Sequence, residues 1–151
     1  MSTRSTEHAT FVIERSFPVE PSRVFAAWAS AEAKTKWWGP EWNEETKLEL
    51  QFEIGGRERF SMTTPEGKTY VYSALYKDIV PGERIVYTYE MYIDDERMSV
   101  SVATIEFATA GEGTELTMTE QGVFLDGHDT VAAREHGTRE LIEKLAATVS
   151  A

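Results

Sequence analysis

The alternation of apolar and polar positions in the middle of the chain predicts a series of β-strands. Apolar side chains recur at every second position in residues 48–54 and 70–76, and again at Ile85, Tyr87 and Tyr89. Alternate side chains of a strand point to opposite faces, so each segment is expected to bury one face. Many of these residues are β-branched or aromatic, and strands favour both kinds.

Turn-forming residues separate these segments at hairpin spacing. The turns are Gly55-Gly56, Pro65-Glu66-Gly67, Pro81-Gly82, Asp94-Asp95-Glu96 and Gly111-Glu112-Gly113. Five turns predict six successive strands in an antiparallel meander. A parallel α/β sheet is disfavoured, because it needs a helix between its strands and no helical pattern interrupts this run.

The segment before the meander predicts one more strand, over residues 10–19, followed by two short helices. Pro21 begins the first helix, because proline suits the first helical turn. Ser30 is expected to cap the second helix over residues 31–38, which Gly39-Pro40 ends.

A long amphipathic helix is predicted at the end of the chain, capped by Asp129 and running to about residue 149. Its apolar side recurs at helical spacing through Val131, Thr138, Ile142, Leu145 and Val149. Such a helix is roughly 30 Å long and covers one face of a curved sheet. The prediction is therefore a single α+β domain over residues 1–151, with a polar tail at about residues 1–9.

Composition and net charge argue against a disordered chain and against nucleic-acid or membrane binding. Hydrophobic residues make up 41% of the chain, which predicts a folded protein rather than a disordered one. The 26 Asp and Glu residues outnumber 15 Lys and Arg residues, giving a net charge of −11. Nucleic acids and anionic membranes attract clustered basic residues, so neither is expected as a partner.

The chain contains no cysteine, and we expect a cytoplasmic location. Its sequence lacks the P-loop, the GxGxxG and GxSxG motifs, and the HExxH pattern of zinc proteases. Three histidines form no recognisable ligand set. We therefore expect neither a metal ion nor a cofactor.

Short phrases in a fixed order carry a family resemblance over about residues 11–149. They are Pro21, Val24-Phe25 and Trp28; Trp37-Trp38-Gly39-Pro40; Gly55-Gly56, Met62, Pro65 and Gly67; Tyr76, Asp78-Ile79 and Glu83-Arg84; Gly113-Thr114 and Leu116; and Gly137, Ile142 and Leu145. The chain resembles the START/Bet-v-1-like (SRPBCC) superfamily, and more closely the activator of heat-shock-protein-90 ATPase homologues. The resemblance implies a helix-grip fold, in which a curved antiparallel sheet of about seven strands wraps the last helix around a cavity.

One departure from the family bears on that cavity. Thr138 stands where the family usually places a tryptophan directly after the glycine of the last helix. Because Thr138 shares a helix face with Ile142 and Leu145, it is expected to face the cavity. A larger or more polar pocket than in relatives is then expected.

Strand phase identifies the side chains that would line this cavity. Glu58, Phe60 and Met62 share one face of a strand, and Leu116, Met118 and Glu120 share one face of another. A carboxyl in an apolar pocket has a raised pKa, so Glu58 or Glu120 could serve in acid–base chemistry or hold a ligand hydroxyl or amine. Alternatively, both carboxylates are hydrated near strand ends or pair with Arg57, Arg59 or another cation.

Aromatic side chains complete the candidate site. Tyrosines at alternate strand positions either line the cavity or pack in the sheet, and Trp38 either closes one end of the core or forms a wall or gate of the cavity mouth. Together, the candidate ligand-binding residues are Trp38, Glu58, Phe60, Met62, Tyr72, Tyr76, Met118, Glu120, Thr138 and Ile142. We predict no catalytic residue.

Three functions compete. The first is binding of a small, largely apolar ligand, aromatic or lipid-like, by a monomer or weak dimer. The second is a cyclase- or hydrolase-like enzyme that uses pocket carboxylates and tyrosines, as other members of the superfamily do. The third is regulation of a chaperone ATPase, with the chaperone as partner, which rests on the family name alone.

Overall fold

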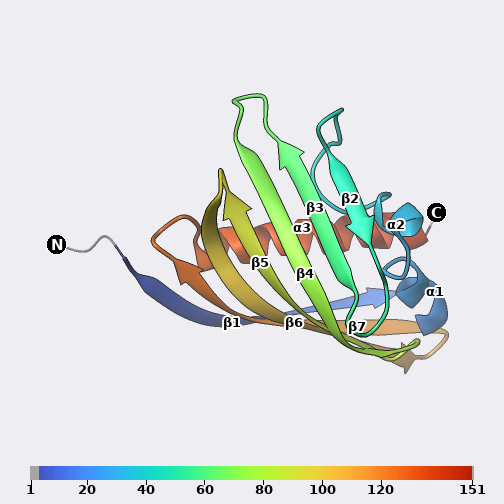
Figure 1. The fold of residues 1–151 in the computed structure, drawn as a ribbon. Helices are drawn as coiled ribbons and strands as arrows, with labels where there is room; N and C mark the ends of the chain where they lie inside the picture. The colour runs from blue at the N-terminus through green and yellow to red at the C-terminus, as the bar shows by residue number, and fades with distance from the viewer. Residues whose placement is uncertain (1–3, 151) are drawn as a thin grey trace.

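The computed structural model describes residues 4–150, which form one antiparallel sheet, two short helices and one long helix (Figure 1). In chain order the elements are β1 (Thr6–Phe17), α1 (Pro21–Ala26), α2 (Ala31–Lys34), β2 (Lys47–Leu50), β3 (Arg57–Thr63), β4 (Thr69–Val80), β5 (Arg84–Ile93), β6 (Glu96–Ala110), β7 (Gly113–Leu125) and α3 (Val131–Val149). The strands lie in the order β1-β7-β6-β5-β4-β3-β2. The expected α+β helix-grip fold with a seven-stranded sheet is confirmed.

The six strands β2 to β7 form the predicted meander, each pairing antiparallel with the next. The first strand then joins the last, with Phe17 opposite Thr114, so β1 and β2 are the outermost strands. Between β5 and β6 the turn places Asp94 and Asp95 at positive φ, a conformation that aspartate tolerates better than most residues. Each predicted turn of the meander falls between two of these strands.

Two strand boundaries were wrong. Strand β1 begins at Thr6, where Leu125 is its partner, rather than at residue 10. Backbone hydrogen bonds hold this polar segment on β7 without apolar side chains, so the expected tail is shorter; residues 1–3 lie outside the described residues. Strand β2 ends at Leu50, and Ile54 is 63% exposed because residues 51–56 form a turn in which Gly56 N donates to Glu53 O.

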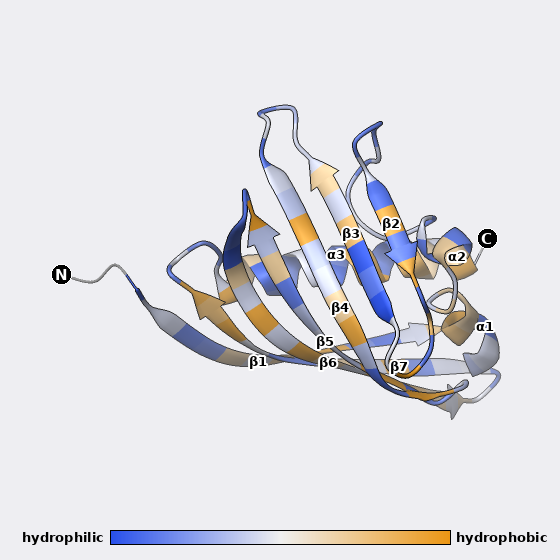
Figure 2. Cartoon of the chain, in the orientation of Figure 1, coloured by the Kyte–Doolittle hydropathy of each residue, from blue (hydrophilic) through white to orange (hydrophobic). Residues whose placement is uncertain are grey.

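One face of the sheet is buried, and α3 lies across that face (Figure 1). Hydrophobic and hydrophilic residues alternate along the strands (Figure 2). On β7, for example, every second residue is buried: Thr114, Leu116, Met118 and Glu120. The alternation predicted from sequence therefore determines which side chains face α3.

The two short helices begin as predicted, but the second is shorter. Ser30 Oγ accepts a hydrogen bond from Ala33 N at 3.1 Å, and α2 ends at Lys34. Turns continue the chain to Trp38, and Gly39 ends them with a φ of +80°. A Cβ at Gly39 would lie 2.6 Å from the Phe60 ring, so both backbone conformation and space require glycine here.

Helix α3 is capped by Thr130, not by Asp129. Thr130 Oγ1 accepts from Ala133 N at 3.1 Å, while Asp129 accepts from Thr130 N and turns toward Arg134. The predicted apolar side is confirmed, with four of its residues buried against the sheet: Thr138, Ile142, Leu145 and Val149.

Polar contacts fix α3 along two of its borders. Toward β1, the Arg15 guanidinium pairs with Glu143 at 2.9 Å, and Arg139 Nη2 donates to Val12 O at 3.3 Å. Toward the turns after α2, Lys144 Nζ donates to Gly39 O at 2.7 Å. None of the helices in residues 4–150 combines the length and apolar character needed to cross a membrane.

Candidate functional site

A pocket of about 400 Å³ lies between α3 and the sheet. Its walls come from strands β3, β4, β5 and β7, from the turns around Trp38, and from the residues of α3 that face them. Eight of the predicted site residues line it: Trp38, Phe60, Met62, Tyr72, Met118, Glu120, Thr138 and Ile142. The structure therefore places most of the candidate residues on the walls of one pocket.

Two of the predicted site residues, Glu58 and Tyr76, lie outside the pocket. The Glu58 carboxylate is 1% exposed and accepts hydrogen bonds from Lys34 Nζ at 2.7 and 2.8 Å and from Tyr76 Oη at 2.5 Å. The sequence predicted either hydration or pairing with Arg57, Arg59 or another cation, and the structure shows pairing with another cation, Lys34, which the sequence analysis did not name. Lys34 and Tyr76 saturate the carboxylate within the core, so it is not available to a ligand.

Lys34 is itself enclosed by aromatic rings. Its ammonium nitrogen lies 3.9 Å from the centre of a Trp38 ring and 5.7 Å from the centre of a Trp28 ring. The pKa of Lys34 is lowered, because the desolvation of burial outweighs the charge of Glu58. Trp28 and Trp38 both line the pocket, so the cation–π contacts with Lys34 help to hold two residues of the pocket wall in position.

The aromatic part of the pocket wall contains two polar atoms without a partner. The Tyr72 ring packs against Trp38 at 5.1 Å and against Tyr89 at 4.8 Å between centres. Although the Tyr87 phenol lies beside it, Tyr72 Oη has no partner in hydrogen-bonding geometry among the described residues, and neither does Trp28 Nε1. A buried polar atom without a partner costs stability, and a bound molecule or water can supply the missing hydrogen bond.

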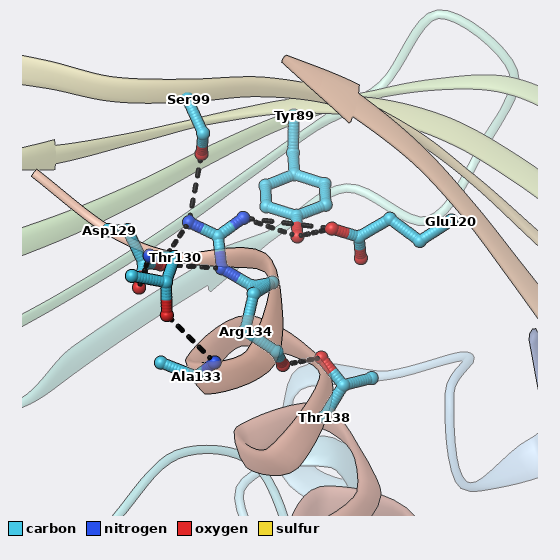
Figure 3. Close-up of polar contacts among 8 residues, drawn as sticks. All are labelled: Tyr89, Ser99, Glu120, Asp129, Thr130, Ala133, Arg134 and Thr138. Atoms are coloured by element: carbon cyan, nitrogen blue, oxygen red, sulfur yellow. Dashed lines mark hydrogen bonds and ion pairs between the residues drawn. The ribbon is translucent and has the colours of Figure 1, made fainter. Parts of the chain in front are cut away.

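Charged side chains gather at the end of the pocket where α3 begins (Figure 3). Arg134 Nη1 donates to Tyr89 Oη at 3.0 Å, and Nη2 donates to Ser99 Oγ at 2.9 Å. The same guanidinium pairs with Asp129 at 2.9 Å, and its Nη1 lies 3.6 Å from Glu120 Oε2. Tyr89 Oη in turn donates to Glu120 Oε2 at 2.6 Å. We call Glu120, Asp129 and Arg134 the charged cluster.

Burial determines the titration of the charged cluster. The Glu120 carboxyl is 1% exposed, and desolvation raises its pKa although Tyr89 and Arg134 partly offset this. Burial also raises the pKa of Tyr89, so its phenol stays protonated and serves as the donor. For Arg134, burial lowers the pKa, but Tyr89, Glu120 and Asp129 raise it by more.

Sequence reasoning missed Lys34 and Arg134, although each left a signal. Arg134 precedes Thr138 by four residues and therefore lies on the side of α3 that faces the sheet. Lys34 likewise precedes Trp38 by four residues, which places a cation beside an aromatic ring. Both cations were overlooked because the helical pattern was followed through apolar positions only.

The described residues hold no group of three or more histidine, aspartate or glutamate side chains suited to a metal ion. His128 pairs with Glu96, and His136 pairs with Glu140 four residues later on the exposed side of α3. Neither histidine lines the pocket.

Comparison with known proteins gives one family. Residues 18–150 match the model of the family described as "Activator of Hsp90 ATPase homolog 1-like protein". A search of curated proteins found no match.

Solved structures of proteins from several organisms share the architecture. A protein from Rhizobium leguminosarum is 41% identical, with 97% of each chain covered and a TM-score of 0.92. One from Rhizobium loti is also 41% identical, covering 95% of this chain and 99% of that one, with a TM-score of 0.89. A third, from Chromobacterium violaceum, is 24% identical over 94% of this chain and 97% of that one, with a TM-score of 0.78, and bears on the fold alone.

Proposed function

The chain belongs to the Activator of Hsp90 ATPase homolog 1-like family, and from its fold and its pocket we propose that it binds a small, largely apolar molecule between α3 and the sheet. The pocket volume of about 400 Å³ carries this proposal. Ligand sites in proteins are commonly about 300–1,000 Å³, with mostly apolar walls and a few polar groups. The aromatic wall and the charged cluster supply both kinds of surface.

The unpartnered Tyr72 hydroxyl and Trp28 indole N–H support the same proposal. Both atoms are buried in residues that line the pocket. Folding leaves two polar atoms buried in the pocket wall, and an acceptor that reached them would recover the cost of their unmade hydrogen bonds. An aromatic or lipid-like ligand with at least one polar group fits this wall.

The family name does not by itself assign chaperone activation to this chain, because one fold hosts many functions. We also propose a cytoplasmic location, on the cysteine-free composition. Cell fractionation checks the location, and a pull-down with the chaperone checks the partner.

Titration with N-phenyl-1-naphthylamine, an apolar dye uncharged at neutral pH, tests the binding proposal. We expect its emission to rise and saturate at one dye per chain, with a rise in Tm that follows ligand concentration. Exciting the dye directly keeps the readout independent of tryptophan content. A wild-type protein that neither enhances the dye nor gains thermal stability would contradict the proposal.

A filled-pocket variant locates the dye. Thr138→Trp places a large ring on the pocket wall, and Thr148→Trp is its matched control, since both threonines bond to a carbonyl one turn earlier and Thr148 is not among the lining residues. Losing about 60 Å² of apolar contact weakens binding about tenfold, so we expect at least that loss for Thr138→Trp and little change for Thr148→Trp. Equal affinities in the two folded variants would place the dye elsewhere.

A further inference from the structure

The charged cluster carries one more negative than positive side chain in a nearly dry place. The side chains of Glu120, Arg134 and Asp129 are 1%, 9% and 16% exposed. One guanidinium thus lies between two carboxylates, both within 4 Å. Buried charge without compensation is costly, so this end of the pocket favours either a proton or a cation.

Asp129 occupies most of the guanidinium, which leaves the excess charge at Glu120. Asp129 Oδ2 accepts from Arg134 Nε at 3.2 Å and pairs with Nη2 at 2.9 Å. Glu120 is only 3.6 Å from Nη1, and its contacts to Tyr89 and Arg134 both reach the single oxygen Oε2 (Figure 3). The other oxygen of Glu120 has no contact from those two residues, and the one further neighbour that lowers the pKa of this carboxyl is the uncharged Ser101 hydroxyl.

An anionic ligand group fits this end poorly. Each of the three nitrogens of the Arg134 side chain already contacts a protein oxygen, on Asp129, Tyr89 or Ser99. A ligand carboxylate would have to displace one of them and lie beside Glu120, where like charges repel in a low dielectric. The three Arg134 nitrogens are therefore already engaged, whereas the Glu120 carboxylate can still accept a hydrogen bond from a ligand.

The aromatic wall next to Glu120 suits a cation as well. The Tyr89 hydroxyl donates to Glu120, and the Tyr89 ring packs against the Tyr72 ring at 4.8 Å between centres. The negative faces of such rings attract ammonium groups. Tyr72 is 5% exposed and lines the pocket together with Tyr89, so a cation held by Glu120 would lie beside two aromatic rings.

We propose that the ligand is an apolar, aromatic-sized amine whose protonated nitrogen is held by Glu120 at the α3 end of the pocket, with its apolar body along the Tyr72 and Trp38 rings. This inference rests on the proposed binding function and adds the chemical class of the ligand. A hydrogen bond between charged groups is worth about tenfold or more in affinity over a neutral one. The chain's net charge of −11 also raises the local concentration of cations.

Displacement of N-phenyl-1-naphthylamine by three matched competitors tests the inference: 2-(1-naphthyl)ethylamine, 2-(1-naphthyl)ethanol and 1-naphthylacetate. On the wild-type protein we expect the amine to compete about tenfold better than the alcohol, and the acid to compete worst. An acid that competes as well as the amine would overturn the inference and leave the binding function intact. A dye that does not bind at all would remove both.

A charge-neutral variant assigns the preference to Glu120. In Glu120→Gln we expect the amine to lose its advantage over the alcohol, with both affinities measured against the affinity of the dye for the same variant. Glu143→Gln makes the same change in net charge on the exposed side of α3, away from the pocket, and should keep the amine's advantage. If Glu120→Gln keeps the full preference, the anchor is not Glu120; if that variant does not fold, the wild-type ranking of the three competitors decides.

Discussion

Lys34 and Glu58 form an ion pair with no exposed surface, although lysine and glutamate are almost never fully buried unless they are paired. Their mutual attraction offsets a desolvation cost of several kcal/mol per ion only because Tyr76 and the surrounding rings complete the contacts. Such pairs are weakly stabilising as a whole and strongly destabilising when half of the pair is removed.

Lys34→Met is expected to lower the free energy of unfolding by about 3–5 kcal/mol, because it leaves a buried carboxylate without its cation. Adding Glu58→Gln should recover much of this loss, since glutamine removes the charge and still accepts from Tyr76. Urea unfolding measures both. Arg15→Met is the control for an exposed ion pair, with an expected loss of about 0–1 kcal/mol. A similarly small loss for Lys34→Met would refute the account.

Glu120 gives the stability of the protein a specific pH dependence. Its pKa in the folded state is raised above its ordinary value of 4.5, so above pH 4.5 the folded chain holds more protons than the unfolded chain. The contribution of Glu120 to stability is therefore full below pH 4.5 and is lost as the pH rises through its folded pKa. The free energy of unfolding of the wild type, minus that of Glu120→Gln, should fall with rising pH in urea titrations. A difference that stays constant or rises would contradict the raised pKa.

Individual residues show which parts of the site the sequence pattern could predict. The phase of Phe60, Met118 and Thr138 was enough to place them on the pocket wall, because periods of two and 3.6 determine which way a side chain points. The same phase put Glu58 on the buried face, but it could not identify which cation pairs with Glu58. Its partner Lys34 comes from another element, and such pairing depends on tertiary distance.

At the scale of elements, the turn-forming residues predicted the number and order of strands correctly, because glycine, proline and aspartate favour turns locally. Boundaries were less predictable. Strand β1 extends to Thr6 through pairing with β7, and α2 stops at Lys34 although its stop signal, Gly39-Pro40, comes only after Trp38. Backbone pairing and packing outweighed the local pattern at both ends.

The cap of α3 allows an element-scale test. Thr130→Ala removes the acceptor for Ala133 N, so we expect a loss of about 1 kcal/mol in the free energy of unfolding. Thr148→Ala is the matched control in the same helix, where alanine's higher helix propensity makes the change about neutral. Chemical denaturation measures both. Equal effects would mean that Asp129, not Thr130, governs the helix start, as the sequence suggested.

At the scale of the whole molecule, the resemblance and the strand pattern predicted the fold, whereas the volume under α3 could not be predicted. That volume is the small difference between what the sheet encloses and what side chains such as Thr138 and Met118 fill. Replacing one small side chain by an aromatic ring can fill this volume, and the period of apolar positions in a sequence does not predict the volume.

The outermost strands of the sheet bear on how the chain behaves in a crowded solution. Strand β2 is four residues long and carries Lys47 and Glu49, and the Val12 carbonyl of β1 is engaged by Arg139. Short, charged or covered edges are poor templates for adding a strand from another copy. Addition of a strand from another copy is thereby disfavoured along β2 and, on β1, at Val12.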